Sequence, residues 1–207
     1  MLKMVLVVDA KLVYGWIRQI IERTSRLSYR PNEIHVGEIS GCLRRAYFDR
    51  RLAKPTLDIR NVIFLIGNGV HYWLQALLKE QGWEAEKKVE QNLGEFKIVG
   101  HIDLYNPKER ILLELKTVGK APVKPYLVHL RQVNSYTVMA KARKGYIVYI
   151  AKDGYIKVFD VKPDFDLWKK TRKRAYQFWY ALQRNQPPRP EFSILCQYCH
   201  WKWRCYG

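Results

Sequence analysis

The spacing of apolar residues changes twice along this chain, and these changes restrict its fold more than any other feature. Residues 84–91, 96–105 and 111–117 have the character of three consecutive β-strands. The segments before and after them, 69–81 and 125–142, carry apolar residues at helical spacing instead. A run of strands enclosed by helices predicts one α/β core.

The rest of the chain extends this core at both ends. The turn residues Asn106–Glu109 separate the second and third strands, so these two strands are expected to form a hairpin. Periodicity predicts two further strands and three further helices, at 145–151, 155–160, 10–27, from near Ser40, and 164–185. Ser40 is expected to cap its helix. The chain therefore has an N-terminal helical section and a tail that follows the last helix.

The chain is strongly basic, which indicates a polyanionic partner. Among its 207 residues, 37 are Lys or Arg and 19 are Asp or Glu, so the net charge is +18. Such an excess is most often associated with nucleic acid, although a generally basic soluble protein has the same composition. No apolar run is long enough to span a membrane and no signal peptide is recognisable, so we expect a cytoplasmic protein with no membrane partner.

Two carboxylates and a lysine on the predicted hairpin carry the strongest catalytic signal. Glu114 and Lys116 are two positions apart on one strand and therefore project from the same face. Asp103 lies on the neighbouring strand, within reach of that face. Both acids are surrounded by apolar residues, where a charge is costly unless it is paired. Carboxylate oxygens suit Mg²⁺ or Mn²⁺, so the sequence predicts a divalent cation here.

A cation in this position favours phosphodiester cleavage. The metal would activate a water molecule and relieve the charge that builds on the phosphate. Lys116 would stabilise that developing charge or orient the nucleophile. The plain alternative is a salt bridge between Lys116 and a cross-strand acid, and Glu-x-Lys alone does not separate the two. The preceding Gly-x-x-Asp, the turn and the following helix favour the nuclease.

Three further residues fit a nuclease site. Gln132 and Tyr136 are four positions apart on the helix after the hairpin, and could hold the substrate backbone or Lys116. His71 follows the glycine-rich sequence Gly67-Asn68-Gly69 and is predicted to begin its helix as a metal ligand. A structural role for Tyr136 and for His71 stays open, and His101 is a weaker competitor for the ligand role.

The four cysteines indicate a second metal site. Cys196, Cys199 and Cys205 form C-x2-C-x5-C at the end of the chain, whereas Cys42 lies far upstream. Four thiolates suit zinc or an iron–sulfur cluster, and two disulfides are disfavoured inside a cell. Because only one C-x2-C pair is present, the spacing favours a 4Fe-4S cluster that joins the two ends of the chain, with zinc as the alternative.

Together these residues resemble the RecB-like nucleases of the PD-(D/E)XK superfamily, and more narrowly the CRISPR-associated RecB-like exonucleases with a four-cysteine cluster. The resemblance covers about residues 36–207. It assigns nuclease, Gln-x-x-x-Tyr and cluster roles to His71, Asp103, Glu114, Lys116, Gln132, Tyr136, Cys42, Cys196, Cys199 and Cys205. Ile102 stands where the superfamily's name has proline. A restriction-endonuclease-like core with a central mixed sheet flanked by helices is therefore expected.

The resemblance also implies an organisation and an activity. Residues 1–66 would form an N-terminal helical section, 67–186 the nuclease core, and 187–207 an iron–sulfur flap. The implied activity is 5′ to 3′ exonuclease action on single-stranded DNA with Mg²⁺ or Mn²⁺. The DNA fragments would be prepared for insertion into a CRISPR array with integrase proteins as partners, and self-association into a homo-oligomer stays open.

Besides a redox sensor that acts through the cluster, two other functions stay open on the sequence. One is a viral or host recombination or repair nuclease of the same superfamily, which the neighbouring genes would distinguish. The other is a non-catalytic DNA-binding module with a structural zinc, which a cleavage assay with and without Mn²⁺ would distinguish.

Overall fold

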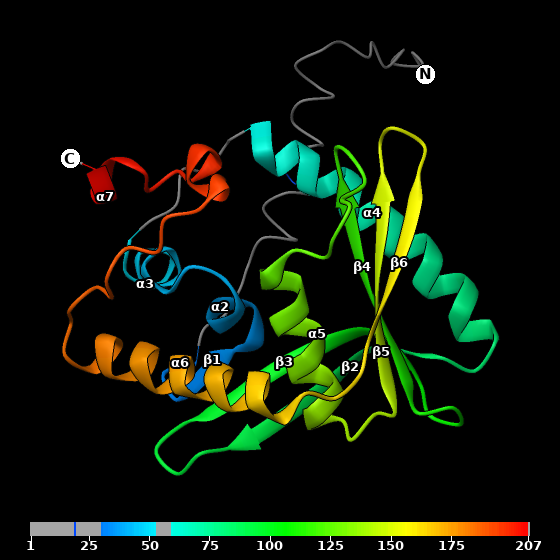
Figure 1. The fold of residues 1–207 in the computed structure, drawn as a ribbon, viewed down its shortest axis with the longest axis horizontal. Coiled ribbons are helices and arrows are strands. Elements are labelled where there is room, and N and C mark those ends of the chain that lie inside the picture. The colour runs from blue at the N-terminus through cyan, green and yellow to red at the C-terminus, as the bar shows by residue number, and fades with distance from the viewer. Residues whose placement is uncertain (1–18, 20–29, 53–58, 207) are drawn as a thin grey trace, which may run out of the picture.

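The structure is a computed structural model that describes Gln19 and residues 30–52 and 59–206. A six-stranded mixed sheet forms its centre (Figure 1). The strands are β1 (Glu33–His35), β2 (Glu84–Asn92), β3 (Lys97–Asn106), β4 (Ile111–Val118), β5 (Lys144–Ala151) and β6 (Ile156–Val161). The helices are α2 (Val36–Ser40), α3 (Leu43–Arg51), α4 (Ile59–Glu80), α5 (Leu127–Met139), α6 (Phe165–Gln183), the 3₁₀ helix η1 (Ile194–Tyr198) and α7 (Trp203–Tyr206).

The sheet runs in the order β1-β3-β4-β5-β6, and β2 pairs with the other edge of β3. The β1–β3 and β4–β5 pairs are parallel, and the remaining pairs are antiparallel. Strand β3 pairs with β1 through residues 97–99 and with β4 only through residues 104–106. Residues 100–103 therefore lie where β3 and β4 diverge. This divergence is the feature of the sheet that positions the candidate site.

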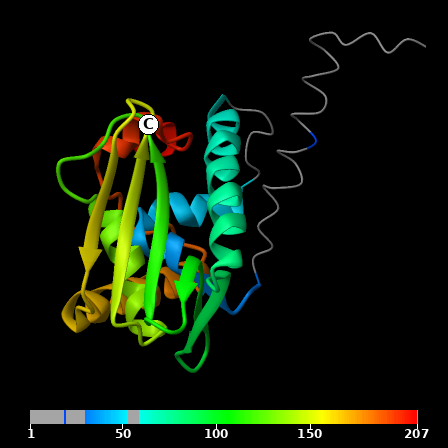
Figure 2. The same cartoon turned by 90° about the vertical axis from the view of Figure 1, so that its right-hand side faces the viewer.

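Helices cover both faces of the sheet. Figure 2 shows α4 running along one side of the sheet, while α5 lies on the other. The buried core includes Ile34, Ile98, Tyr149 and Phe178, which come from strands β1, β3 and β5 and from helix α6. The α/β class and the central mixed sheet flanked by helices are thus confirmed. No helix in the described ranges is long and apolar enough to cross a membrane.

Most of the expected strands and helices agree with the structure within a few residues, but two helix starts were wrong. Helix α4 begins at Ile59 rather than near Gly69. Gly67 lies inside this helix. A larger residue would not fit there, because its Cβ would come 2.6 Å from the Thr117 Oγ1 of β4. The glycine thus allows close packing and does not mark a helix start.

Ser40 does not cap the following helix. Ser40 is the last residue of α2, and its hydroxyl donates to the Val36 carbonyl 2.7 Å away. Cys42 is the N-cap residue of α3. A serine hydroxyl can bond back to the preceding turn as readily as it caps a new one. The helix expected at 10–27 lies outside the described residues apart from Gln19.

Candidate active site

Asp103 lies at the point where β3 and β4 separate. Its Oδ2 accepts a hydrogen bond from the Leu115 backbone N–H at 2.7 Å. The side chain thus bonds to the β4 backbone just beyond the last paired residues, Leu104 and Leu113. Asp103 is only 9% exposed. A backbone donor and burial together hold one carboxylate oxygen in a fixed position at the fork of the sheet.

Glu114 supplies a second, deeper carboxylate on β4. Its side chain is buried, and its Oε1 accepts a hydrogen bond from Lys116 Nζ at 2.7 Å. The other oxygen, Oε2, is buried without a hydrogen-bond partner among the described residues. Burial raises the pKa of Glu114 to about 7, and Asp103 contributes to the rise while the Lys116 ammonium opposes it. A buried acceptor left unpaired is costly, so this oxygen is a marker for a missing partner.

Lys116 stays charged beside these acids. Burial alone would lower its pKa, but the carboxylates of Glu114 and Asp103 outweigh burial and raise it. The expected convergence of Asp103, Glu114 and Lys116 on one place is therefore present in the structure. An ordinary salt bridge accounts for Glu114 Oε1 but leaves Oε2 unexplained.

Helix α4 brings His71 to the same place. His71 Nδ1 lies 3.6 Å from Asp103 Oδ1, and Asp103 raises the pKa of His71 against the opposing effect of burial. On the same helix, Gln75 Nε2 donates to the Asp103 carbonyl at 3.2 Å. The close approach of Gly67 to Thr117 brings α4 near enough to the sheet for these contacts to form. His101, the weaker candidate, has an exposed side chain.

Helix α5 covers the site from the other face. Gln132 Nε2 donates to Tyr136 Oη at 3.2 Å, and Tyr136 is buried. Burial and then the charge of Glu114 raise the pKa of the Tyr136 phenol. A Cβ on Gly100 would lie 2.4 Å from the Tyr136 ring. The glycine of Gly-x-x-Asp therefore provides room for Tyr136 beside the carboxylates.

The sequence did not reveal that His129 and Tyr149 also border Lys116. Tyr149 is the register partner of Lys116 on β5, and its hydroxyl lies 2.8 Å from His129 Nδ1. Burial, and then the Lys116 charge, lower the pKa of His129 to about 3. The available signal was spacing, because His129, Gln132 and Tyr136 follow one another at helical intervals on one face of α5.

The donor set fits a hard divalent cation, although its members are not gathered as a closed metal site. Within residues 30–52 and 59–206, no group of three or more His, Cys, Asp or Glu side chains is close enough to hold an ion without movement. Glu114 Oε2 nevertheless has no hydrogen-bond partner among the described residues, and Asp103 and His71 lie near enough to act on the Glu114 charge. Carboxylate oxygens with one imidazole are suitable ligands for Mn²⁺ or Mg²⁺.

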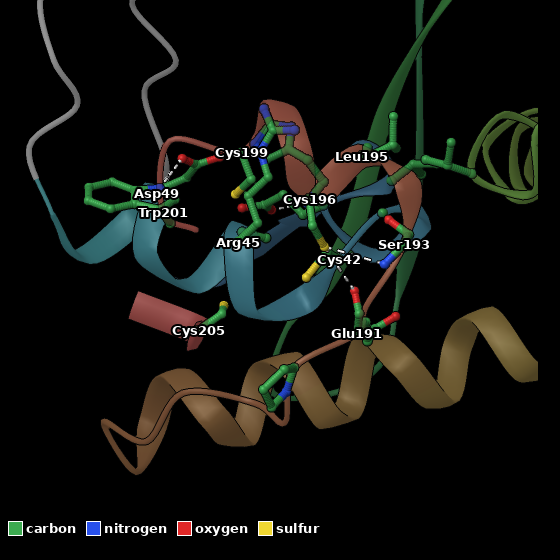
Figure 3. Close-up of a pocket in the computed structure, with 18 of the residues that line it drawn as sticks. Cys42, Arg45, Asp49, Glu191, Ser193, Leu195, Cys196, Cys199, Trp201 and Cys205 are labelled. Atoms are coloured by element: carbon green, nitrogen blue, oxygen red, sulfur yellow. Dashed lines mark hydrogen bonds and ion pairs between the residues drawn. The ribbon is translucent and has the colours of Figure 1, made fainter. Parts of the chain in front are cut away.

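All four cysteines border one cavity of about 580 Å³ (Figure 3). Cys42 comes from the start of α3, Cys196 from η1, Cys205 from α7, and Cys199 from the turn between the last two. All four are free thiols with partly exposed side chains. The two ends of the described chain therefore meet at one site whose donor chemistry fits a thiolate-bound metal or cluster.

The sequence of this chain resembles that of a known exonuclease. No protein-family profile matches the chain. The CRISPR-associated exonuclease Cas4 of Saccharolobus solfataricus is 26% identical over 178 residues, which cover 81% of this chain and 84% of that protein. The chain is therefore similar to a CRISPR-associated exonuclease over most of its length.

Two solved structures support the fold. The crystal structure of SSO0001 superposes with a TM-score of 0.74 at 22% identity and covers 93% of this chain and 96% of its own. LHK-Exo in complex with dAMP, from Laribacter hongkongensis, gives a TM-score of 0.50 at 11% identity and covers 83% and 93%. At these identities the agreement concerns the arrangement of helices and strands.

Proposed function

We propose that this chain, which is related to the Cas4-type RecB-like nucleases, is a metal-dependent exonuclease of DNA. The observation that carries the proposal is Glu114 Oε2, a buried carboxylate oxygen with no partner beside Lys116 and Asp103. A sheet selected only for stability gains nothing from such an oxygen, because an unpaired buried acceptor costs roughly 1–3 kcal/mol. A cation bound during catalysis would be the partner that this oxygen otherwise lacks.

The ligands of this cation would be Asp103, Glu114 and His71, and the ion would be Mg²⁺ or Mn²⁺. When bound, it supplies an activated water and neutralises charge on the scissile phosphate. Lys116 presents an ammonium to the charge that develops on the phosphate. Gln132 and Tyr136 form a hydrogen-bonded pair on α5 that orients groups at the site.

The substrate proposed is single-stranded DNA, or DNA with single-stranded ends, digested in the 5′ to 3′ direction. The net charge of +18 supports a polyanionic substrate. The similarity to a CRISPR-associated exonuclease supports exonuclease action. Substrates labelled at one end test the direction of digestion directly.

A cleavage assay on oligonucleotides labelled at either the 5′ or the 3′ end tests this function. With Mn²⁺ or Mg²⁺, the wild-type protein should release short products from one end, and EDTA should stop the reaction. Asp103→Asn and Glu114→Gln should abolish cleavage while DNA binding persists. Glu109→Gln is the matched control, since this acid lies in the exposed turn of the same hairpin, with a side chain 64% exposed. Undiminished cleavage by Glu114→Gln would refute the metal site.

The four cysteines are proposed to hold a 4Fe-4S cluster. Their convergence on one cavity supports a thiolate-bound group, and the single C-x2-C pair favours the cluster over zinc. Protein purified without oxygen should be brown and contain about four iron atoms per chain, as expected for this cluster type. One zinc and no iron per chain would replace the cluster with a zinc site.

The cellular role proposed is the preparation of DNA fragments for insertion into a CRISPR array, with integrase proteins as partners. Its support is the similarity to the Cas4 exonuclease. Co-expression with the integrase proteins of the same genome tests it. A stable complex that trims fragment ends is the expected result, whereas nuclease activity without any such association would favour a recombination or repair nuclease.

A further inference from the structure

The three C-terminal cysteines lie on a segment with few backbone ties to the rest of the molecule. The backbone hydrogen bonds described within residues 193–205 are short-range turns, such as Cys199 N–H to the Cys196 carbonyl at 3.1 Å and Cys205 N–H to the Lys202 carbonyl at 3.0 Å. No strand of the sheet includes this segment. Side chains must therefore hold it against α3, where Cys42 lies.

The first side-chain connection is a pair that we call the Arg174 clamp, formed by Arg174 of α6 and Glu191. Arg174 Nη1 lies 2.9 Å from Glu191 Oε2, and Glu191 Oε1 accepts from the Leu43 backbone N–H at 3.1 Å. The same guanidinium donates to the Ile39 carbonyl at 2.7 Å and to the Gly41 carbonyl. The clamp therefore bonds to the backbone on both sides of Cys42.

The Arg174 clamp also reaches the C-terminal cysteines. The Glu191 carbonyl lies 3.9 Å from Cys196 Sγ, which in turn accepts from the Ser193 backbone N–H at 3.3 Å. Figure 3 shows Glu191 and Ser193 beside Cys196, opposite the start of α3. Arg174 is largely buried, with 15% of its side chain exposed, so its bonds are shielded from water. One charged pair thus fixes the first C-terminal cysteine relative to Cys42.

The second connection, which we call the Asp49 clamp, holds the end of the segment. Asp49 Oδ1 accepts from Trp201 Nε1 at 2.8 Å and lies 3.1 Å from His200 Nε2. Trp201 is 5% exposed and packs against Phe48 with ring centroids 5.9 Å apart. His200 and Trp201 lie in the chain between Cys199 and Cys205, so the Asp49 clamp holds the stretch with these two cysteines against α3. Figure 3 shows Asp49 beside Trp201.

Neither clamp contains a cysteine. We infer that Arg174, Glu191 and Asp49 are positioning residues that hold the segment with the three C-terminal cysteines against the part of the chain around Cys42 before any metal or cluster binds. The inference rests on the proposed function only for the identity of the bound group. The cluster is then not needed to bring the two ends of the chain together, and its binding requires only that the four cysteine side chains move to close around it. Arg174 is suited to this role because its planar guanidinium bonds several acceptors at once, which a lysine ammonium cannot reproduce.

Hydrogen–deuterium exchange of residues 194–206 tests the inference without relying on activity. In a full-length variant with all four cysteines changed to serine, these amides should keep their protection. Adding Arg174→Gln or Asp49→Ala to that variant should reduce protection on the order of tenfold or more, since each removes charge-assisted hydrogen bonds. Lys170→Gln is the matched control, because it removes one exposed positive charge from the same helix. Loss of protection in the serine variant alone would overturn the inference.

Iron binding provides the second readout, in the cysteine-containing protein. Arg174→Gln should speed the loss of iron to a chelator on the order of tenfold, and Arg174→Lys should fail to restore the wild-type rate. Asp49→Asn keeps an acceptor for Trp201 and should lose iron more slowly than Asp49→Ala. If the wild-type protein contains no iron, the proposed cluster is wrong, while the exchange experiment still decides the positioning role. Iron loss from all these variants at the wild-type rate would refute positioning and leave the cluster standing.

Discussion

His129 gives the most direct test of the electrostatics around the site. Burial, and then the charge of Lys116, lower the pKa of His129 from 6.5 to about 3, while its Nδ1 lies 2.8 Å from the Tyr149 hydroxyl. Between pH 3 and 6.5 the unfolded chain binds a proton at this imidazole and the folded chain does not. Stability from His129 is therefore complete above pH 6.5 and falls as the pH decreases.

The size of the effect follows from the shift. Each pH unit below 6.5 costs about 1.4 kcal/mol, so His129 should destabilise the fold by about 2 kcal/mol at pH 5 relative to pH 7. His129→Gln keeps an acceptor for the Tyr149 hydroxyl but cannot be protonated in this range. The free energy of unfolding of this variant should therefore depend less on pH than that of the wild type, by about that amount.

Urea unfolding followed by circular dichroism at pH 7 and pH 5 measures this difference. Each variant is compared with the wild type at the same pH, so other titrating groups cancel to first order. His101→Gln, at an exposed position, is the control for replacing an imidazole by an amide. Equal pH dependence in His129→Gln and the wild type would refute the assignment of a buried, neutral His129.

Three further results are expected. Lys116→Ala should lower the single-turnover cleavage rate on the order of 10²-fold with a smaller effect on DNA affinity, measured by rapid quench and by anisotropy; a pure affinity loss would reduce Lys116 to a phosphate contact. Gly100→Ala should destabilise the fold by about 1–3 kcal/mol in urea unfolding, because its Cβ would meet the Tyr136 ring at 2.4 Å, and Tyr136→Leu should recover part of the loss. Log DNA affinity should fall steeply and linearly with log salt concentration, and a flat plot would separate the +18 charge from DNA binding.

The sequence predicted the sheet well because its strands are neighbours along the chain. The hairpin of β3 and β4 needs only local alternation and the turn Asn106–Glu109, and the structure reproduces both strands within a residue. The start of α4 was wrong because Gly67 resembles a helix boundary locally. Its actual role depends on Thr117, which is 50 positions away, and no periodicity reports such a contact.

The candidate site was predicted in part for the same reason. Asp103, Glu114 and Lys116 share a hairpin, so strand geometry alone brings them together. The hydrogen bond between His129 and Tyr149 joins α5 to β5 and could not be foreseen from spacing within one segment. The two clamps that hold the C-terminal segment could not be foreseen either, because most of their contacts join residues more than 100 positions apart. Only the pair of Arg174 and Glu191 is closer in the sequence. The division of the chain at residues 66 and 186 stays a prediction.

The fork between β3 and β4 connects the fold to the proposed chemistry. Along the edge of β3 that faces β1 and β4, residues 100–103 pair with neither strand in the described sheet, so ladder hydrogen bonds are given up there. The Asp103 side chain replaces one of them by accepting from the Leu115 N–H, and Tyr136 fills the space left at Gly100. What the fork does not satisfy is Glu114 Oε2. Under the proposed function, a cation held by Asp103, Glu114 and His71 would be the missing partner of that oxygen. The loss of pairing between β3 and β4 and the unpaired carboxylate therefore lie next to each other, at the place where the proposed cation would bind.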